Sequence, residues 1–411
     1  MNTILFYIII GIILCEYLLE RYLEYLNNRQ WSNVVPGELQ GIYDPESYKR
    51  SQEYYRANVR LSAITSTFSL IIILLMLFLS GFARLDEWIS KVTGHPVASS
   101  LLFFGILFLA FDLIQIPFAV YDTFVIEQKF GFNRTTVSTF ITDKIKGWLL
   151  AAIIGGALIS LFVLFYEMTG TAFWIWAWIM VTGFMIIMNM FFSNLIVPLF
   201  NKQTPLEPGF LRDTIETYCT KTGVRLDNIF VIDGSKRSSK ANAYFTGLGK
   251  KKRIVLFDTL IRDLETNEIV AVLAHETGHD KHKHTYVSLS AGILQAGLIL
   301  FFLSLFIDNQ SLSAALGSDI ASFRLGLIAF GILYSPLSTI MGLGMNFISR
   351  KHEYAADRFA AITWNADDLS QALKKLSVKN LSNLNPHPAY VIFHYSHPPL
   401  LQRIKAMKGI N

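Results

Sequence analysis

The sequence is poor in charge and almost free of cysteine. Only 16% of its 411 residues are Asp, Glu, Lys or Arg, whereas 52% are hydrophobic. So little charge excludes an ordinary soluble globular protein and is typical of a polytopic membrane protein. The two cysteines, Cys15 and Cys219, exclude a disulfide framework and a thiolate metal site. The net charge of +5 is too small to indicate nucleic acid as a partner, and basic loops beside membrane spans explain it better.

Long apolar runs account for the high hydrophobic content. A helix needs about 20 residues to cross a bilayer, and seven stretches are long and apolar enough. They are residues 3–19, 61–82, 97–116, 147–166, 173–196, 285–307 and 325–348. The first has neither a basic start nor a small-residue cleavage site, so we interpret it as an anchor rather than a signal peptide.

Basic residues are distributed unevenly between the loops. The loops after the second, fourth and sixth predicted spans hold only Arg84, Lys91 and Arg324, whereas those after the first and third are rich in lysine and arginine. The positive-inside rule then predicts that the N-terminus lies outside. The same rule places the polar segments that follow the fifth and seventh spans on the cytoplasmic side of the bilayer.

The polar part of the chain is split in two by the last two spans. We expect four consecutive parts, of which the first and third hold the spans: residues 1–200, 201–284, 285–349 and 350–411. The sequence therefore predicts a mainly α, polytopic membrane protein with one small α+β domain, which the last two spans interrupt.

Short patterns in the first polar part predict its secondary structure. The expected elements are a helix at 211–222, a strand at 229–232, and a hairpin of 241–246 and 253–257 that turns at 247–250. Thr266 is the expected N-cap of a further helix. We expect this last helix to continue directly into the sixth span.

The most informative motif is His-Glu-Thr-Gly-His at 275–279, just before the sixth predicted span. On a helix, residues four apart share one face, so His275 and His279 can bind one zinc ion together. Glu276 lies beside them and is a candidate general base for a water that the zinc activates. The motif alone fits two surface histidines and a chance glutamate equally well. However, eight of the nine histidines lie between His275 and His397, which favours a metal site.

Catalytic zinc usually has three protein ligands and one open position, so a third ligand is needed. The best candidate is Glu353, with Asp357 one helical turn later on the same face. One carboxylate would bind the metal while the other orients a ligand histidine. His282 competes, but on a helix it lies about 10 Å along the axis from the first histidine of the motif. We therefore expect His282 and His284 to be solvated or juxtamembrane, and we leave His352 out of the site.

Several other motifs lie in a fixed order around these residues. Together with the metal motif they occupy residues 117–121, 124–127, 130–133, 198–201, 205–206, 239–244, 275–279, 353 with 357, and 396–399 with 403. In this order they resemble the integral-membrane zinc metalloproteases of the CaaX prenyl protease type 1 family. The first span and residues 308–323 carry little of the resemblance.

The resemblance implies a fold. Seven transmembrane helices would form a barrel around a large, water-filled polar chamber. A gluzincin-like zinc protease domain would face this chamber. Asp112 and Glu127 lie in or near the third predicted span, where a buried charge is costly and often functional. We expect both carboxylates to line the chamber.

The resemblance also implies a metal site with one Zn²⁺ per chain. Its ligands would be His275, His279 and Glu353, and Glu276 would act as the general base. Asp357 is expected to support the ligands from outside the coordination sphere.

Three further residues match family positions near the substrate or the ligands. Asn242 and His397 would engage the substrate backbone or the developing oxyanion. An asparagine on an edge strand can hydrogen-bond a peptide laid alongside it, and a histidine near zinc can stabilise a tetrahedral intermediate. Arg403 would pair with a carboxylate and brace the site.

Family members remove C-terminal residues from prenylated CaaX proteins, so we predict a membrane-embedded zinc endopeptidase with a peptide or protein substrate. The chain is shorter than eukaryotic members, and its end at 408–411 has no obvious retention signal. These features predict a bacterial inner-membrane enzyme, for which quality control of unprenylated membrane proteins is an alternative function. A pseudoprotease, or a transporter or receptor with a structural zinc, is an alternative of another class. A structural zinc usually has four protein ligands and needs no general base.

Overall fold

The computed structural model describes residues 3–32, 34–35, 37, 40–223, 228–247 and 253–409. Its fold is mainly helical, with one small sheet. The helices are α1 (Thr3–Arg29), α2 (Pro45–Phe78), α3 (Gly81–Val92), α4 (Pro96–Tyr121), α5 (Val137–Leu150), α6 (Gly156–Thr169), α7 (Phe173–Leu195), α8 (Val197–Phe200), α9 (Phe210–Thr222), α10 (Asp258–Asp263), α11 (Thr266–Lys281), α12 (His284–Phe306), α13 (Gln310–Ala315), α14 (Phe323–Thr363), α15 (Ala366–Lys379), α16 (Pro388–His394) and α17 (Leu400–Lys408). The strands are β1 (Gln203–Pro205), β2 (Asn228–Ile232), β3 (Ala243–Thr246) and β4 (Arg253–Phe257).

Within the described residues, five helical segments are long and apolar enough to cross a membrane. They are Pro45–Phe78, Pro96–Glu127, Val137–Phe200, His284–Phe306 and Phe323–Thr363. The third segment contains two of the seven predicted spans, 147–166 and 173–196. The first predicted span forms helix α1 but is not among the five. The chain is therefore a multi-pass membrane protein, and the number of seven spans stays a prediction.

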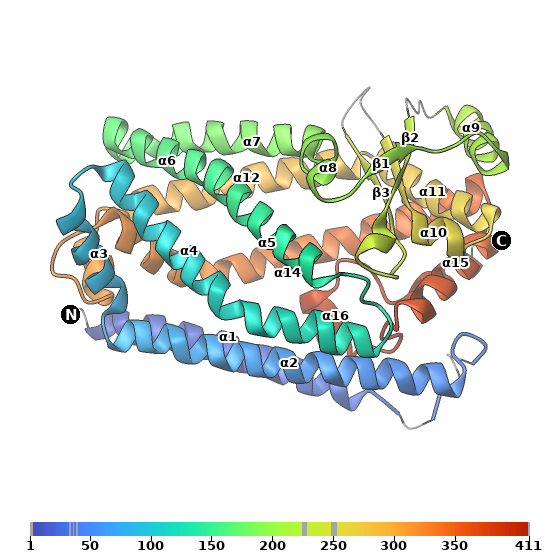
Figure 1. The fold of residues 1–411 in the computed structure, drawn as a ribbon, viewed down its shortest axis with the longest axis horizontal. Coiled ribbons are helices and arrows are strands. Elements are labelled where there is room, and N and C mark those ends of the chain that lie inside the picture. Colours follow the sequence, from blue (N-terminus) through green and yellow to red (C-terminus); the bar gives the residue numbers. More distant parts are fainter. Residues whose placement is uncertain are drawn as a thin grey trace.

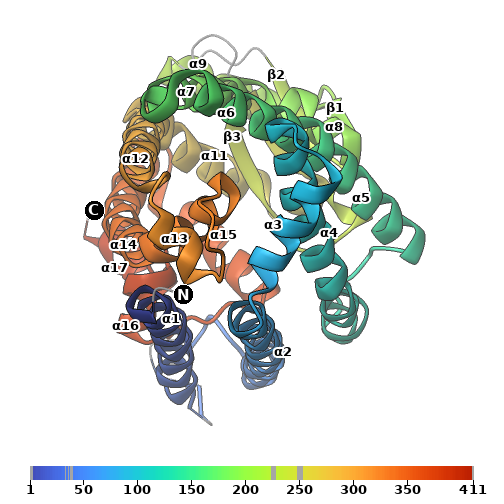
Figure 2. The ribbon, with the colours of Figure 1, turned by 90° about the vertical axis from the view of Figure 1, so that its left-hand side faces the viewer.

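The long helices form a ring when the molecule is viewed along its length. In Figure 1 they run side by side along the long axis, with the sheet and the short C-terminal helices gathered at one end. Figure 2 shows them end-on, where α1, α2, α4, α7, α12 and α14 follow one another around a common centre. Large apolar side chains such as Phe111, Ile153, Ile179 and Ile340 are exposed on these helices. Such a surface suits lipid as the solvent rather than water.

The sheet has the strand order β1-β2-β4-β3, which leaves β3 at one edge. β2 and β4 are parallel, while β1 and β3 pair antiparallel with their neighbours. The predicted strand at 229–232 and the predicted hairpin are therefore confirmed as β2 and as the pair β3–β4. The predicted turn at 248–250 lies outside the described residues. One hydrophobic core joins the chain before α12 to the chain after α14, with Leu256 and Leu273 buried alongside Leu369 and Met407.

The helix that carries the His-Glu-Thr-Gly-His motif begins one residue earlier than expected. Thr266 is its first helical residue, and Glu265 is the N-cap. The Glu265 side chain accepts the backbone N–H of Glu268, whose own carboxylate accepts the N–H of Glu265. This reciprocal capping box satisfies two backbone donors where a threonine side chain would satisfy one.

The same helix does not continue into the membrane, so that prediction is wrong. α11 ends at Lys281, and Lys283 has a φ of 58°, in the left-handed region. A residue in this conformation cannot propagate a right-handed helix. A new helix, α12, then starts at His284 in a different direction. This break controls where the histidines that follow the motif are placed.

Helix α14 carries Glu353 and Asp357 from the membrane part to the sheet end of the molecule (Figure 1). It crosses α11 at very close range. A Cβ atom added to Gly278 of α11 would lie 2.9 Å from the Cα atom of Ala356 in α14. Only glycine permits this approach, and the approach brings the two motif-bearing helices together.

Candidate metal centre and active site

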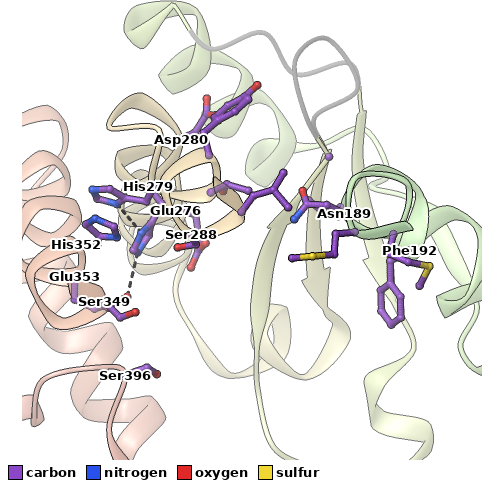
Figure 3. A pocket seen from close by; sticks show the side chains of 18 of the residues that line it. Asn189, Phe192, Glu276, His279, Asp280, Ser288, Ser349, His352, Glu353 and Ser396 are labelled. Atoms are coloured by element: carbon purple, nitrogen blue, oxygen red, sulfur yellow. Dashed lines mark hydrogen bonds and ion pairs between the residues drawn. The ribbon is translucent and has the colours of Figure 1, made fainter. Parts of the chain in front are cut away.

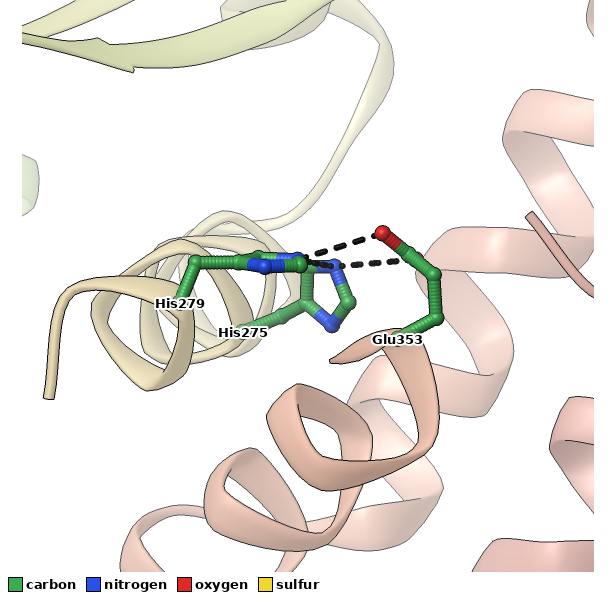
Figure 4. Close-up of side chains that lie close together, drawn as sticks. All are labelled: His275, His279 and Glu353. Atoms are coloured by element: carbon green, nitrogen blue, oxygen red, sulfur yellow. Dashed lines mark hydrogen bonds and ion pairs between the residues drawn. The ribbon is translucent and has the colours of Figure 1, made fainter. Parts of the chain in front are cut away.

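Three side chains from α11 and α14 converge on one point. The Nε2 atoms of His275 and His279 are 3.2 Å apart. Glu353 faces both rings, with Oε1 3.2 Å from His279 Nε2 and Oε2 3.5 Å from His275 Nε2. Figure 4 shows the two rings projecting from α11 towards the Glu353 carboxylate. In the described part of the chain these residues are the one group of three or more possible donors that meets at a single point.

This arrangement fits a divalent metal ion. Four ligands at about 2.0–2.1 Å in a tetrahedron lie about 3.4 Å from one another, close to the three measured separations. The Oε2 atom of Glu353 is buried and has no hydrogen-bond partner among the described residues, although Arg403 Nη1 lies 3.5 Å away in an ion pair. A buried carboxylate oxygen without a hydrogen bond is costly, and a cation bound between the three donors would satisfy it. Two histidines and one carboxylate are also a donor set that zinc accepts.

Asp357 and Arg403 support His275 from behind. Oδ1 of Asp357 is 2.9 Å from His275 Nδ1, the ring nitrogen that points away from the other two donors. Arg403 donates two hydrogen bonds to the same carboxylate, from Nε at 2.8 Å and from Nη2 at 2.6 Å. All three side chains are buried. A carboxylate at Nδ1 fixes the orientation and tautomer of a ligand histidine.

His284 supports His279 in a corresponding way, which the sequence did not predict. Its Nδ1 atom is 2.9 Å from Nδ1 of His279. Its ring stacks on His352 with centroids 3.8 Å apart and an interplanar angle of 8°. His284 is buried rather than solvated, and it is the first residue of α12, a helix able to cross a membrane, which agrees with the juxtamembrane alternative; His282 is exposed as expected. The helix break at Lys283 turns His284 back towards α11, and no periodic pattern in the sequence signals such a break.

Glu276 follows His275 on α11 and lines a cavity with all three candidate ligands. The cavity has a volume of about 860 Å³, and Figure 3 shows Glu276, His279 and Glu353 along one side of it. Protein atoms shield the Glu276 carboxyl from water and thereby raise its pKa, while the neighbouring His275 and His279 oppose that rise. A carboxylate with a raised pKa is a stronger proton acceptor.

His397 reaches the same point from the loop before α17. Its Nε2 atom lies 3.2 Å from Oε1 of Glu353, and its Nδ1 atom lies 2.9 Å from the Ser396 hydroxyl oxygen. The side chain is 63% exposed. It lines the cavity together with Glu276. An exposed imidazole next to the candidate metal site can contact a molecule bound in the cavity.

Asn242 is the one predicted site residue that lies apart from this group. It directly precedes β3, is exposed, and is absent from the described residues that line the cavity. Its backbone oxygen accepts the N–H of Phe257, and its side-chain oxygen accepts the N–H of Ala243. The edge strand β3 that follows does reach the cavity, through Thr246 and Gly247.

The two carboxylates expected to line the chamber have partners in the structure. Asp112 accepts hydrogen bonds from Lys144 Nζ and Trp148 Nε1, each at 2.8 Å. Glu127 forms an ion pair with Lys240, and neither carboxylate lines the cavity at the candidate metal centre. A sequence pattern does not reveal such partners from distant segments, and the expectation that both carboxylates line a chamber stays a prediction.

The Lys240 side chain connects the membrane part to the segment that precedes β3. Its Nζ atom is 3.0 Å from Glu127 Oε2 and 2.9 Å from the Tyr54 hydroxyl. The ammonium group also lies 4.5 Å from the ring centre of Phe132. Ion pairing and cation–π contact together fix the backbone two residues before Asn242. Two motifs noted in the sequence, at 124–133 and 239–244, therefore meet in space.

The sequence was compared with family models and with known proteins. The family described as "CAAX prenyl protease N-terminal, five membrane helices" matches residues 24–202, and peptidase family M48 matches residues 205–411. CAAX prenyl protease 1 of Saccharomyces cerevisiae is 37% identical, over 98% of this chain and 95% of the relative. The CAAX prenyl protease 1 homolog of Homo sapiens is 31% identical, over 95% of this chain and 93% of the relative.

A solved structure has the same fold. The crystal structure of S. mikatae Ste24p superposes with a TM-score of 0.93 at 35% sequence identity, covering 98% of this chain and 99% of that chain. These relatives are eukaryotic and give no support to a bacterial source. The membrane helices, the converging donor triad and both family matches agree with one another. The chain therefore belongs to peptidase family M48 and is a membrane-bound metalloendopeptidase of the CAAX prenyl protease type.

Proposed function

We propose that this chain is a zinc endopeptidase that cleaves near the C-terminus of prenylated CaaX proteins. The observation that carries the proposal is the convergence of His275, His279 and Glu353 on one point at the wall of a large cavity. The relatives named CAAX prenyl protease supply the substrate class. A zinc ion bound to these three ligands would polarise the scissile carbonyl and acidify a water molecule.

The remaining chemistry is proton transfer and charge stabilisation by the protein. Glu276 accepts a proton from the attacking water and passes it to the leaving amine, a task that suits a carboxylate with a raised pKa. His397, whose Nε2 atom lies beside Glu353, donates a hydrogen bond to the oxyanion that develops on the substrate carbonyl. Its exposure leaves the ring free to meet the substrate.

The side chains around the candidate ligands keep them in position. Asp357 holds His275 with the help of Arg403, and His284 holds His279. Supports of this kind preserve ligand orientation when a substrate enters.

The substrate would bind as an extended strand along β3. The free edge of β3 offers backbone groups to a peptide, and Asn242 at its start offers a side-chain amide. The facing wall of the cavity comes from α7, where Phe184, Met188 and Phe192 follow one another at helical spacing. This apolar stripe suits a prenyl group or an apolar side chain near the cleavage site.

We further propose seven membrane spans. Helix α1 and the two halves of Val137–Phe200 would each cross the bilayer, in addition to the four other apolar segments. The loop charges then put the N-terminus outside and the protease domain on the cytoplasmic side. The positions of the spans divide the chain into four parts, at residues 1–200, 201–284, 285–349 and 350–411. The bacterial inner membrane stays a prediction from the sequence.

The decisive experiment is cleavage of a prenylated CaaX peptide by the purified full chain in detergent, together with measurement of bound zinc. Glu276→Gln is expected to keep about one zinc per chain and to lower kcat by about 10²–10⁴-fold. The control is Glu216→Gln, which removes an exposed carboxylate on α9 that pairs with Arg212. It should match the wild type in both measurements.

The alternatives give different results in this experiment. Cleavage of an unprenylated membrane protein but not of the CaaX peptide would favour a quality-control protease. Full activity of Glu276→Gln would refute its role as general base. Wild-type protein without zinc would refute the metal assignment.

A further inference from the structure

A second cavity, of about 730 Å³, lies where the membrane helices meet the sheet. It shares no lining residue with the cavity at the metal centre. Its walls come from α5, from α7 and α8, and from β1, β2 and β4 with the loop after β2. Figure 1 shows α8 at this junction, between the end of α7 and the sheet. We call this cavity the basic pocket.

The basic pocket contains four cationic side chains and a single carboxylate. The cations are Lys146, Lys202, Lys236 and Arg253, and the carboxylate is Asp233. Within the residues that the structure describes, none of the four cations forms a salt bridge. Four positive charges around one hollow repel one another, and an anion in the hollow relieves that repulsion.

Asp233 offsets only one of the four positive charges, and the nearby carboxylate of Asp143, which interacts with Lys146 and Lys236, is already paired with Arg237. The Oδ1 atom of Asp233 accepts Nδ2 of Asn201 at 2.9 Å and the backbone N–H of Lys202 at 2.8 Å. Two of the cations have uncharged partners: Lys146 donates to the backbone oxygen of Leu199 at 2.7 Å, and Arg253 lies over the Phe230 ring. The ammonium groups of the two lysines on the sheet side remain available for an anion.

The position of the basic pocket indicates the source of the anion. Large apolar side chains are exposed on the same helices that form its membrane side: Ile145 and Leu149 on α5, Leu195 on α7 and Leu199 on α8. A ligand that satisfies both surfaces carries a phosphate and acyl chains. Basic pockets between membrane helices bind such headgroups in other proteins.

We infer that the basic pocket binds the phosphate headgroup of an anionic phospholipid, with its acyl chains along α5 and α8. The lipid would bridge the membrane helices and the sheet, because Lys146 belongs to the former and Lys202 and Lys236 to the latter. This site is separate from the proposed peptidase site and does not depend on it.

The test is native mass spectrometry of the full chain in detergent, titrated with phosphatidylglycerol or with phosphatidylcholine. Wild type should bind one phosphatidylglycerol with clear preference over phosphatidylcholine. Lys202→Gln with Lys236→Gln should weaken this binding about thirtyfold, which corresponds to about 1 kcal/mol for each lysine. Lys202→Arg with Lys236→Arg keeps the charge and should retain binding, which separates loss of the ligand from loss of the fold.

The matched control removes two exposed lysines of α17, by Lys405→Gln with Lys408→Gln. It changes the net charge equally and should leave lipid binding within twofold of wild type. Equal weakening by control and pocket variants, or no preference of wild type for the anionic lipid, would overturn the site. Displacement of phosphatidylglycerol by an equal concentration of inorganic phosphate would overturn the lipid as occupant and favour a free phosphate ester.

Discussion

The close crossing of α11 and α14 at Gly278 predicts that one added methyl group will weaken metal binding. In Gly278→Ala the new Cβ would lie 2.9 Å from Cα of Ala356 and 3.1 Å from its carbonyl oxygen. Both are backbone atoms of a long helix, so neither can rotate away. Non-bonded carbon atoms have an optimal separation of about 3.5–4.0 Å. The two helices must therefore move apart by roughly 0.5–1 Å.

This separation acts directly on the candidate ligands. His279 follows Gly278 on α11, and Glu353 lies one turn before the contact on α14. Their donor atoms are 3.2 Å apart, and an added 0.5–1 Å would move them beyond the spacing of about 3.4 Å that a tetrahedral zinc site needs. We expect metal affinity to fall by about 10–100-fold, as when the supports of metal ligands are removed.

Stability should change much less than metal affinity. Overpacking lowers the free energy of unfolding by about 1–3 kcal/mol, whereas replacing a helical glycine with alanine raises it by up to about 1 kcal/mol. The net loss of stability is therefore about 0–2 kcal/mol.

The assay is competition between the protein and a zinc chelator, with unfolding of the metal-free chain measured in parallel. Gly342→Ala is the control, because a Cβ at this α14 glycine meets no atom within 4 Å. Wild-type metal affinity in Gly278→Ala would refute the idea that this contact sets the ligand spacing.

Three other changes test the surroundings of the site. Asp357→Asn should lower metal affinity about 10–100-fold and destabilise the metal-free chain by about 3 kcal/mol, because the buried Arg403 keeps only its longer, 3.5 Å ion pair with Glu353. Chelator competition and denaturant unfolding measure the two effects, and unchanged affinity would contradict the orienting role. His284→Ala should lower metal affinity by about tenfold in the same competition assay. An effect on stability alone would indicate that this residue contributes only to packing. Glu127→Gln should raise KM in peptide cleavage without loss of bound zinc, because the partner Lys240 positions the segment before β3; a fall in zinc content would contradict this placement.

The sequence was most informative where the geometry is local. The spacing of His275 and His279 follows from the helix repeat alone, and so does the shared face of Glu353 and Asp357. The structure brings all four residues together, and Arg403, which the family resemblance suggested, joins them. Apolar runs also indicated a multi-pass protein, because a bilayer requires long uncharged helices.

The sequence failed where the structure depends on distant segments or on a single backbone dihedral. The left-handed conformation of Lys283 ends α11, and no residue preference predicts it at a lysine. As a consequence, the sequence indicates a solvated or juxtamembrane His284 and does not show that this residue supports a candidate ligand. The ion pair of Glu127 with Lys240 is equally hidden, because the two residues lie in distant segments of the chain. Pairs of this kind become visible only once the tertiary structure is known.

The division of the candidate ligands between α11 and α14 has a consequence for folding. Helix α12 and the N-terminal part of α14 separate His279 from Glu353 along the chain, and both are segments able to cross a membrane. The donor atoms can meet only after these segments have packed, so the free energy of metal binding also stabilises the packing of the membrane helices. A packing defect in α12, far from the metal, must then weaken metal binding through the same linkage. Metal affinity is thus a measure of how well the membrane part and the sheet end are assembled, and not only of the three ligands themselves.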